Sequence, residues 1–142
     1  MANFKHIDEG IFIGPQPAEQ DLGEAKQLGI QTVIDMRMPG ESPIANDEMT
    51  GRNGLGYFNI PVNKTALAGH QIDELEHAME RMPGPYLLHC ATGARAALLL
   101  VLSRARQRGW TAERTFREAQ GMGFNLADSD NFAVFVKEIT AQ

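Results

Sequence analysis

Cys90 and Arg95 are the residues of this chain whose types and spacing best suit chemistry. Cys90 is the only cysteine among 142 residues, and four residues separate it from the arginine: Ala91, Thr92, Gly93 and Ala94. A thiolate is the nucleophilic form of cysteine. A guanidinium offers a planar pair of donors that match a tetrahedral oxyanion. The spacing therefore indicates a nucleophile beside an oxyanion-binding group.

The flanking sequence predicts a strand, a tight loop and a helix around this pair. Residues 86–89 form a short apolar run after the breakers at 83–85, and residues 94–108 are rich in Ala, Leu and Arg. Unpaired amides and the helix dipole at such a helix start favour anions. Gly93 would let the loop curl. We expect Cys90 to be open to solvent at the mouth of this cradle and to be held partly as thiolate.

A simpler interpretation of Cys90 is that of a small buried hydrophobic residue, the usual role of a lone cysteine in an intracellular protein. The arrangement around it favours the functional interpretation. A strand, then Cys-x-x-Gly-x-Arg, then a long helix is a specific pattern, and it predicts a nucleophile.

The composition of the chain limits which classes of protein it can belong to. The chain has the length of one domain, residues 1–142, and its 43% hydrophobic content supports a core. With 13 basic and 18 acidic residues it offers no basic surface for nucleic acid. A single cysteine suits a reducing compartment. No apolar run approaches the roughly 18 residues of a membrane span, and the start is no signal peptide, so we expect a cytoplasmic protein without a membrane partner.

The periodicity predicts strands alternating with helices. The expected strands are 11–13, 31–36, 57–62 and 86–89, and the expected helices are 17–28, 71–82, 94–108 and 111–120, with a last helix capped by Asp128 or Ser129. This order predicts an α/β domain with a parallel-dominated sheet, whose ligands bind at the carboxyl edge of the strands. Asp35 and Arg37 at that edge are expected to form a structural ion pair. Residues 39–56 read as a long loop, which is typical either of a lid or recognition segment or of a plainly disordered segment.

The segment from His89 to Arg95 resembles the active loops of two families. One is the cysteine-dependent tyrosine and dual-specificity phosphatases, with five residues between Cys and Arg, and the other is the rhodanese sulfurtransferases, commonly with four. The segments 11–17, 22–29, 32–37 and 57–62 resemble the phosphatase domain. Together they look most like the phosphatase-like domain of bacterial beta-lactamase-hydrolase-like proteins, which shares the shortened loop. The resemblance implies a tyrosine-phosphatase-like fold with Cys90 and Arg95 as catalytic residues, a loop of 91–94 that binds the oxyanion, and His89 in support.

Two departures from the phosphatase pattern concern catalysis. Related phosphatases carry a general-acid Asp where this chain has Asn63 and Lys64, and a hydroxyl residue where it has Ala96, for which Thr92 is a partial substitute. Losing acid catalysis costs a factor of about 10²–10⁴. If Asn63 occupies the place of the acid, Asn63→Asp should raise turnover of alkyl phosphates more than that of aryl phosphates. Other carboxyl and imidazole groups are candidate acids: Asp73, Asp128, Asp130 and His70.

Three functions remain open from the sequence. A phosphatase would act on phosphomonoesters, best on aryl phosphates such as phosphotyrosine, through a phosphoenzyme on Cys90. A sulfurtransferase would carry a persulfide on Cys90 and would need no general acid, and a weakly active oxyanion-binding regulatory module is the third. The substrate would be a phosphorylated or sulfur-carrying small molecule or protein. The histidines at 6, 70, 77 and 89 are scattered, so no metal site and no cofactor are expected.

Overall fold

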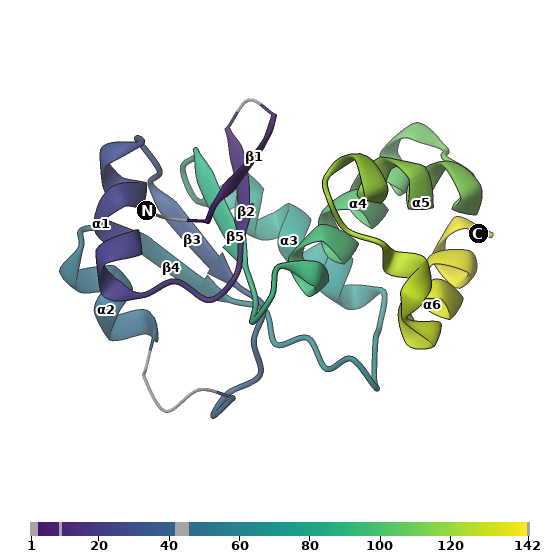
Figure 1. Ribbon diagram of the computed structural model, residues 1–142, viewed down its shortest axis with the longest axis horizontal. Helices are drawn as coiled ribbons and strands as arrows, with labels where there is room; N and C mark the ends of the chain where they lie inside the picture. The colour runs from purple at the N-terminus through teal and green to yellow at the C-terminus, as the bar shows by residue number, and fades with distance from the viewer. Residues whose placement is uncertain (1–2, 9, 42–45, 142) are drawn as a thin grey trace.

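A computed structural model describes residues 3–8, 10–41 and 46–141 of the chain. Its centre is a five-stranded sheet in the order β1-β2-β5-β3-β4 (Figure 1). The strand bounds are Lys5–Asp8 for β1, Ile11–Gly14 for β2, Thr32–Asp35 for β3, Gly56–Asn59 for β4 and Tyr86–His89 for β5. Only β1 runs antiparallel to its neighbour, and the other pairs are parallel. The predicted parallel-dominated α/β fold is confirmed.

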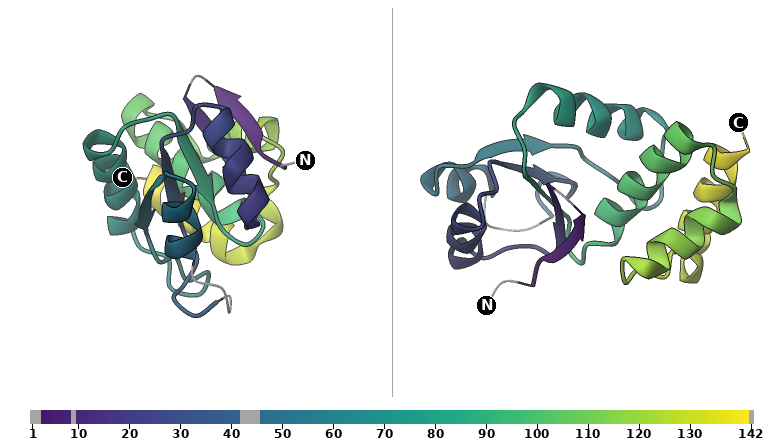
Figure 2. Two further views of the ribbon diagram at one scale, coloured as in Figure 1. Left: turned by 90° about the vertical axis from the view of Figure 1, so that its left-hand side faces the viewer. Right: turned by 90° about the horizontal axis from the view of Figure 1, so that it is seen from above.

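Helices cover both faces of this sheet (Figure 2). The helix bounds are Glu19–Gln27 for α1, Asn46–Arg52 for α2, His70–Arg81 for α3, Ala94–Arg108 for α4, Ala112–Gly121 for α5 and Asp130–Thr140 for α6, with a short 3-10 turn, η1, at Leu126–Asp128. Helices α1 and α2 lie on one face and α3 and α4 on the other, while α5 and α6 pack against α4 as an outer layer.

The alternation of side chains along the central strands explains the two layers. Ile34 and Leu88 face the larger core cluster, with α3, α4 and α6, whereas Val33 and Leu87 face the smaller cluster under α1 and α2. All four are fully buried. Because successive side chains of a strand point to opposite faces, a strand that is apolar at every position must be covered on both sides. The sheet thereby fixes where β5 ends and α4 begins.

The helix boundaries follow the expected capping residues. The hydroxyl of Thr111 accepts from the Arg114 amide, and that of Ser129 accepts from the Phe132 amide, so Ser129 rather than Asp128 caps the last helix. Strand β4 lies at the sheet edge, as expected next to Pro61. Within the described residues, no helix has both the length and the apolar character that a membrane crossing demands.

Two elements depart from the expectation. Strand β1 forms at the polar N-terminal stretch by pairing with β2, through contacts such as His6 opposite Phe12. The segment 39–56 is also not one loop, because α2 forms within it and buries Met49 and Thr50. Both elements gain their stability from tertiary contacts, which a local pattern does not contain. Residues 42–45 of that segment lie outside the described part of the chain.

Candidate active site

The loop that carries Cys90 joins the end of β5 to the start of α4. Its last residue, Gly93, has φ of 101°, a left-handed conformation that favours glycine. A Cβ atom built at Gly93 would lie 3.0 Å from the Phe124 ring. Gly93 is therefore needed both for the turn and for the close approach of the outer layer.

The backbone amides of the loop after Cys90 are hydrogen-bond donors of this site. The Gly93 amide donates to Sγ over 3.0 Å. The amides of Ala91, Thr92, Arg95 and Ala96 have no hydrogen-bond acceptor among the residues that the structure describes. These donors lie at the N-terminal end of a 15-residue helix, where the dipole also favours negative charge. The loop thus has the form expected of an anion-binding cradle.

The expectation that the sulfur is open to solvent is wrong. Cys90 is 1% exposed and belongs to the larger core cluster. The reason is its position directly after the buried strand β5, at the floor of the loop. By contrast, Ala91 and Thr92 are exposed, and Ala91 and Arg95 border a cavity of about 390 Å³. A ligand would therefore reach the loop through this cavity.

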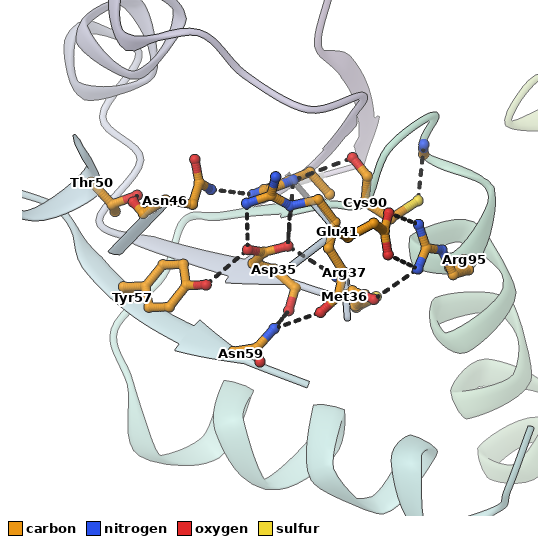
Figure 3. Close-up of polar contacts among 12 residues, drawn as sticks. Asp35, Met36, Arg37, Glu41, Asn46, Thr50, Tyr57, Asn59, Cys90 and Arg95 are labelled. Carbon is orange, nitrogen blue, oxygen red and sulfur yellow. Dashed lines mark hydrogen bonds and ion pairs between the residues drawn. The ribbon is translucent and has the colours of Figure 1, made fainter. Parts of the chain in front are cut away.

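The guanidinium of Arg95 is held by a carboxylate from the segment after β3. Nη1 and Nη2 of Arg95 donate to the two oxygens of Glu41 over 2.9 and 2.6 Å (Figure 3). Nη1 also donates to the Val62 carbonyl over 2.9 Å. These bonds to Glu41 raise the pKa of Arg95 against the opposing effect of burial, and a negative charge on Cys90 raises it further. The guanidinium is therefore charged and fixed beside the sulfur.

Glu41 contacts Arg95 without filling the cradle. Its Oε1 also accepts from the Met38 amide over 2.9 Å, and no amide of residues 90–95 donates to it in the described chain. The Nε edge of Arg95 has no oxygen acceptor among the described residues. The carboxylate thus takes one edge of the guanidinium, and the other edge is left for a ligand.

A buried polar network lies behind the loop (Figure 3). Asp35 accepts two side-chain hydrogen bonds from Arg37, over 3.1 and 3.0 Å, and a third from the Tyr57 hydroxyl over 2.8 Å. Burial raises the pKa of Asp35, but the hydrogen bonds from Arg37 and from the Tyr57 hydroxyl outweigh it, so the pKa is lowered. Asp35 and Arg37 form the structural pair that the sequence predicts. Asn59 joins the network by donating to the carbonyl oxygens of both.

His89 connects this network to the loop. The Asn46 amide nitrogen lies 2.9 Å from His89 Nε2. An amide nitrogen only donates, so Nε2 must accept and the ring proton must be on Nδ1. Nδ1 lies 3.4 Å from the Cys90 carbonyl and 3.8 Å from Asp35 Oδ1. Burial lowers the pKa of His89 to about 4 despite the opposing charge of Asp35. A neutral imidazole therefore orients the Cys90 peptide from inside, the supporting position predicted for His89.

The residues at the place of the missing acid also line the cavity. Asn63, Lys64 and Thr65 all line it. The Asn63 side-chain oxygen accepts from the Thr65 amide and hydroxyl over 2.9 and 2.8 Å. This turn directs the oxygen of Asn63 back into its own loop.

None of the candidate general acids lines the cavity. Asp73 is paired over 2.7 Å with Arg106, eleven residues beyond Arg95 and so about 16 Å along α4. Asp128 ends η1, and Asp130 begins α6. His70 is exposed and pairs with Glu74 over 3.7 Å.

Thr92 does not take the place of the missing hydroxyl either. Its oxygen accepts from the Ala94 amide over 3.3 Å rather than donating to the sulfur.

Sequence reasoning missed Glu41 and Asn46 as parts of the site. Both come from the segment 39–56, which the pattern presented as a loop. A signal did exist for Glu41, since an acidic residue shortly after a central strand of a parallel sheet lies at the edge where ligands bind. Asn46 had no local signal, because its role depends on the position of α2 against β5.

Comparison with known proteins identifies the family and the fold of the chain. Residues 3–107 match the family model described as the phosphatase-like domain of beta-lactamase hydrolase-like protein. The beta-lactamase hydrolase-like protein of Xylella fastidiosa (strain Temecula1) is 30% identical over 125 residues, which cover 84% of this chain. The match covers 29% of that relative, so the chain spans less than a third of its length.

Solved structures share the fold over nearly the whole chain. A candidate phosphatase from Neisseria meningitidis Z2491 superposes with a TM-score of 0.80 and 28% identity, covering 98% of this chain and 99% of its own. The core catalytic domain of the PP-IP phosphatase SIW14 from S. cerevisiae superposes with a TM-score of 0.74 and 19% identity, covering 95% and 83%. The fold is that of the tyrosine-phosphatase-like enzymes, and the chain belongs to the phosphatase-like domain family of beta-lactamase hydrolase-like proteins.

Proposed function

We propose that this domain hydrolyses phosphomonoesters through a covalent phosphoenzyme on Cys90. The observation that carries the proposal is the set of unpartnered backbone amides in the loop after Cys90, at the start of α4, with the charged guanidinium of Arg95 beside the sulfur. These donors suit the three non-bridging oxygens of a phosphoryl group, whose charge is stabilised by fixed donors in a site shielded from water.

The reaction has two steps in this proposal. The Cys90 thiolate attacks phosphorus, forming the S–P bond as the bond to the leaving oxygen breaks, and the leaving oxygen takes a proton from water. Water then attacks phosphorus, the S–P bond breaks, inorganic phosphate leaves and the thiolate is regenerated. No metal or redox partner is needed for either step to balance.

Aryl phosphates are the preferred substrates in this proposal. Glu41 is the one carboxyl group among the described residues that line the cavity. Hydrogen bonds from Arg95 lower the pKa of Glu41 to about 2, against the smaller effect of burial. Glu41 is therefore ionised near neutral pH and has no proton to give to a leaving alkoxide. A phenol leaves without that help. The Pseudomonas aeruginosa protein TpbA, which shares the fold at 16% identity, has been crystallised with phosphotyrosine.

The test is vanadate-sensitive hydrolysis of 4-nitrophenyl phosphate by the wild-type protein and by Cys90→Ser. We expect the substitution to remove at least about 10³-fold of the activity, since it removes the nucleophile, while the circular dichroism spectrum stays unchanged. Mass spectrometry after acid quenching should detect a phosphate adduct on Cys90 in the wild type. Wild-type activity in Cys90→Ser would show that the nucleophile assignment is wrong.

Sulfur transfer is the second candidate, favoured by one feature: the four-residue spacing between Cys90 and Arg95. Thiocyanate production from thiosulfate and cyanide distinguishes it, because that reaction needs a Cys90 persulfide and not a phosphoenzyme. Turnover of thiosulfate without turnover of aryl phosphate would replace the phosphatase proposal. Anion binding without either activity would favour the regulatory module.

A further inference from the structure

Two side chains that line the cavity beside the Cys90 loop carry hydrogen-bond donors without an acceptor among the described residues. Because the Asn63 oxygen accepts from the Thr65 amide, its amide nitrogen must point the other way, and that nitrogen has no partner among the described residues. The Lys64 ammonium likewise has no carboxylate within salt-bridge distance in the described part of the chain. Both side chains are exposed and line the same cavity as Arg95.

The backbone that carries these donors is held from two sides. Thr65 closes the turn at Asn63 through both of its hydrogen bonds. The side chain of Asn131, at the start of α6, donates to the Lys64 carbonyl over 2.9 Å. The position of Lys64 is thus fixed at its backbone, while its ammonium group remains available to a ligand.

The charges that border the cavity suit a ligand with more than one negative charge. Glu41 already neutralises Arg95 through a two-bond ion pair, and the thiolate that the proposed reaction requires at Cys90 adds one negative charge. Without Lys64 this set would carry a net charge of −1, and a second anionic group of the ligand would meet no positive charge of its own. With Lys64 the set is neutral, and the added positive charge belongs to a residue that Glu41 does not pair with.

We propose that Asn63 Nδ2 and Lys64 Nζ form a second anion-binding subsite, which selects phosphate esters whose leaving group carries a further anionic group. This proposal rests on the phosphatase function proposed above. The scissile phosphate occupies the cradle of residues 90–96, and the second anionic group meets the donors of Asn63 and Lys64. The position that carries a proton donor in related phosphatases here serves recognition instead.

Binding provides a test that does not require catalysis. Pyrophosphate offers a second anionic group beside the one that the cradle would hold, whereas inorganic phosphate offers only one. We expect Lys64→Gln to weaken pyrophosphate binding about 5-fold, the effect of one partly exposed ion pair, and to weaken phosphate binding less than 2-fold. Titration calorimetry measures both. Lys64→Arg should retain binding, and Lys26→Gln on α1 is the control for the same change of net charge.

Turnover supplies the second readout. The probes are 3-carboxy-4-nitrophenyl phosphate and the carboxamide of the same shape, which differ only in one negative charge. Wild type should favour the carboxylate in kcat/KM about 5-fold at low salt, and Lys64→Gln should remove this preference. The preference should also shrink as sodium chloride is raised, because the pair is exposed.

The outcomes separate the two proposals. If Lys64→Gln affects phosphate and pyrophosphate equally, or affects neither, the subsite is refuted even when aryl phosphates are hydrolysed. If pyrophosphate binding depends on Lys64 but no phosphate ester is turned over, the subsite stands and the phosphatase function fails.

Discussion

The two sides of the Cys90 loop differ in how far their polar groups are already paired. Behind the loop, Asp35, Arg37 and His89 are buried and bonded to one another or to Asn46, and only Arg37 Nη1 and Asn46 Oδ1 lack partners among the described residues. In front of it, the residues 63–65 are exposed. We call these the rear network and the front border.

This difference separates two tasks. A buried polar group without a partner destabilises the fold, so the rear network must be complete before a ligand arrives. An exposed donor is solvated and can exchange water for a ligand at little cost. We therefore expect substitutions behind the loop to change stability and all turnover, and substitutions in front to change which substrate is preferred.

Arg95→Lys should have the largest effect, because Arg95 is held by Glu41 and the Val62 carbonyl and also lines the cavity. Lysine cannot keep the two bonds to Glu41 while it presents a second edge to a ligand. We expect kcat/KM for 4-nitrophenyl phosphate to fall about 10²–10³-fold, the usual loss on removing one donor to a transition-state oxyanion. Steady-state kinetics measures this, with thermal unfolding to verify the fold. A loss below 5-fold would mean that the backbone amides suffice.

Glu41→Gln should have the second-largest effect on kcat/KM, because it leaves Arg95 in place but removes its charged partner. We expect kcat/KM to fall about 10-fold through misplacement of the guanidinium. Stability offers an independent measurement. The pKa of Glu41 is held near 2, below its ordinary 4.5, so this ion pair stabilises the fold above pH 4.5 and the contribution disappears as pH falls toward 2. Urea unfolding at several pH values should lose that part of the pH dependence in Glu41→Gln but not in the control Glu80→Gln.

The titration of His89 should have a smaller effect on the free energy of unfolding than the titration of Glu41, and at higher pH. Its pKa is about 4 in the fold and 6.5 ordinarily. Between these values the unfolded chain binds a proton that the folded protein does not, so the free energy of unfolding should fall as pH drops from 6.5 to 4. Nitrogen-15 spectra should show neutral His89 with its proton on Nδ1 at pH 5.5. An imidazolium at that pH would contradict the assigned role of Asn46.

Asn63→Asp should have the smallest effect on an uncharged leaving group. The Thr65 amide and hydroxyl would bind the new carboxylate as they bind the amide oxygen, and such bonds favour its ionised form. These hydrogen bonds therefore argue against the rise in alkyl phosphate turnover that the sequence predicts for this substitution. We expect changes below about 3-fold for alkyl and aryl substrates alike, with a loss for the anionic probe. A selective rise for alkyl phosphates would show that position 63 can deliver a proton.

Local pattern predicted most of the elements, for physical reasons that the structure makes plain. Strands β3 and β5 are apolar at consecutive positions because both faces are covered, and α5 and α6 start at hydroxyl caps. The loop from Cys90 to Arg95 could also be predicted from the sequence, because Gly93 and the long helix after it are local features. The contacts of Glu41 with Arg95 and of Asn46 with His89 join segments that are distant in the sequence, so the local pattern could not predict them. The exposure of Cys90 was mispredicted for the same reason.

The ring of Phe124 lies against Gly93, and Lys5 of β1 lies 5.0 Å above the same ring. Residue 124 follows the end of the family match at residue 107. The family match therefore stops short of a side chain that packs against the Cys90 loop at Gly93. A chain cut at residue 107 would uncover Gly93 together with the apolar flank of α4, and we expect it to lose a fixed loop shape before it loses the sheet.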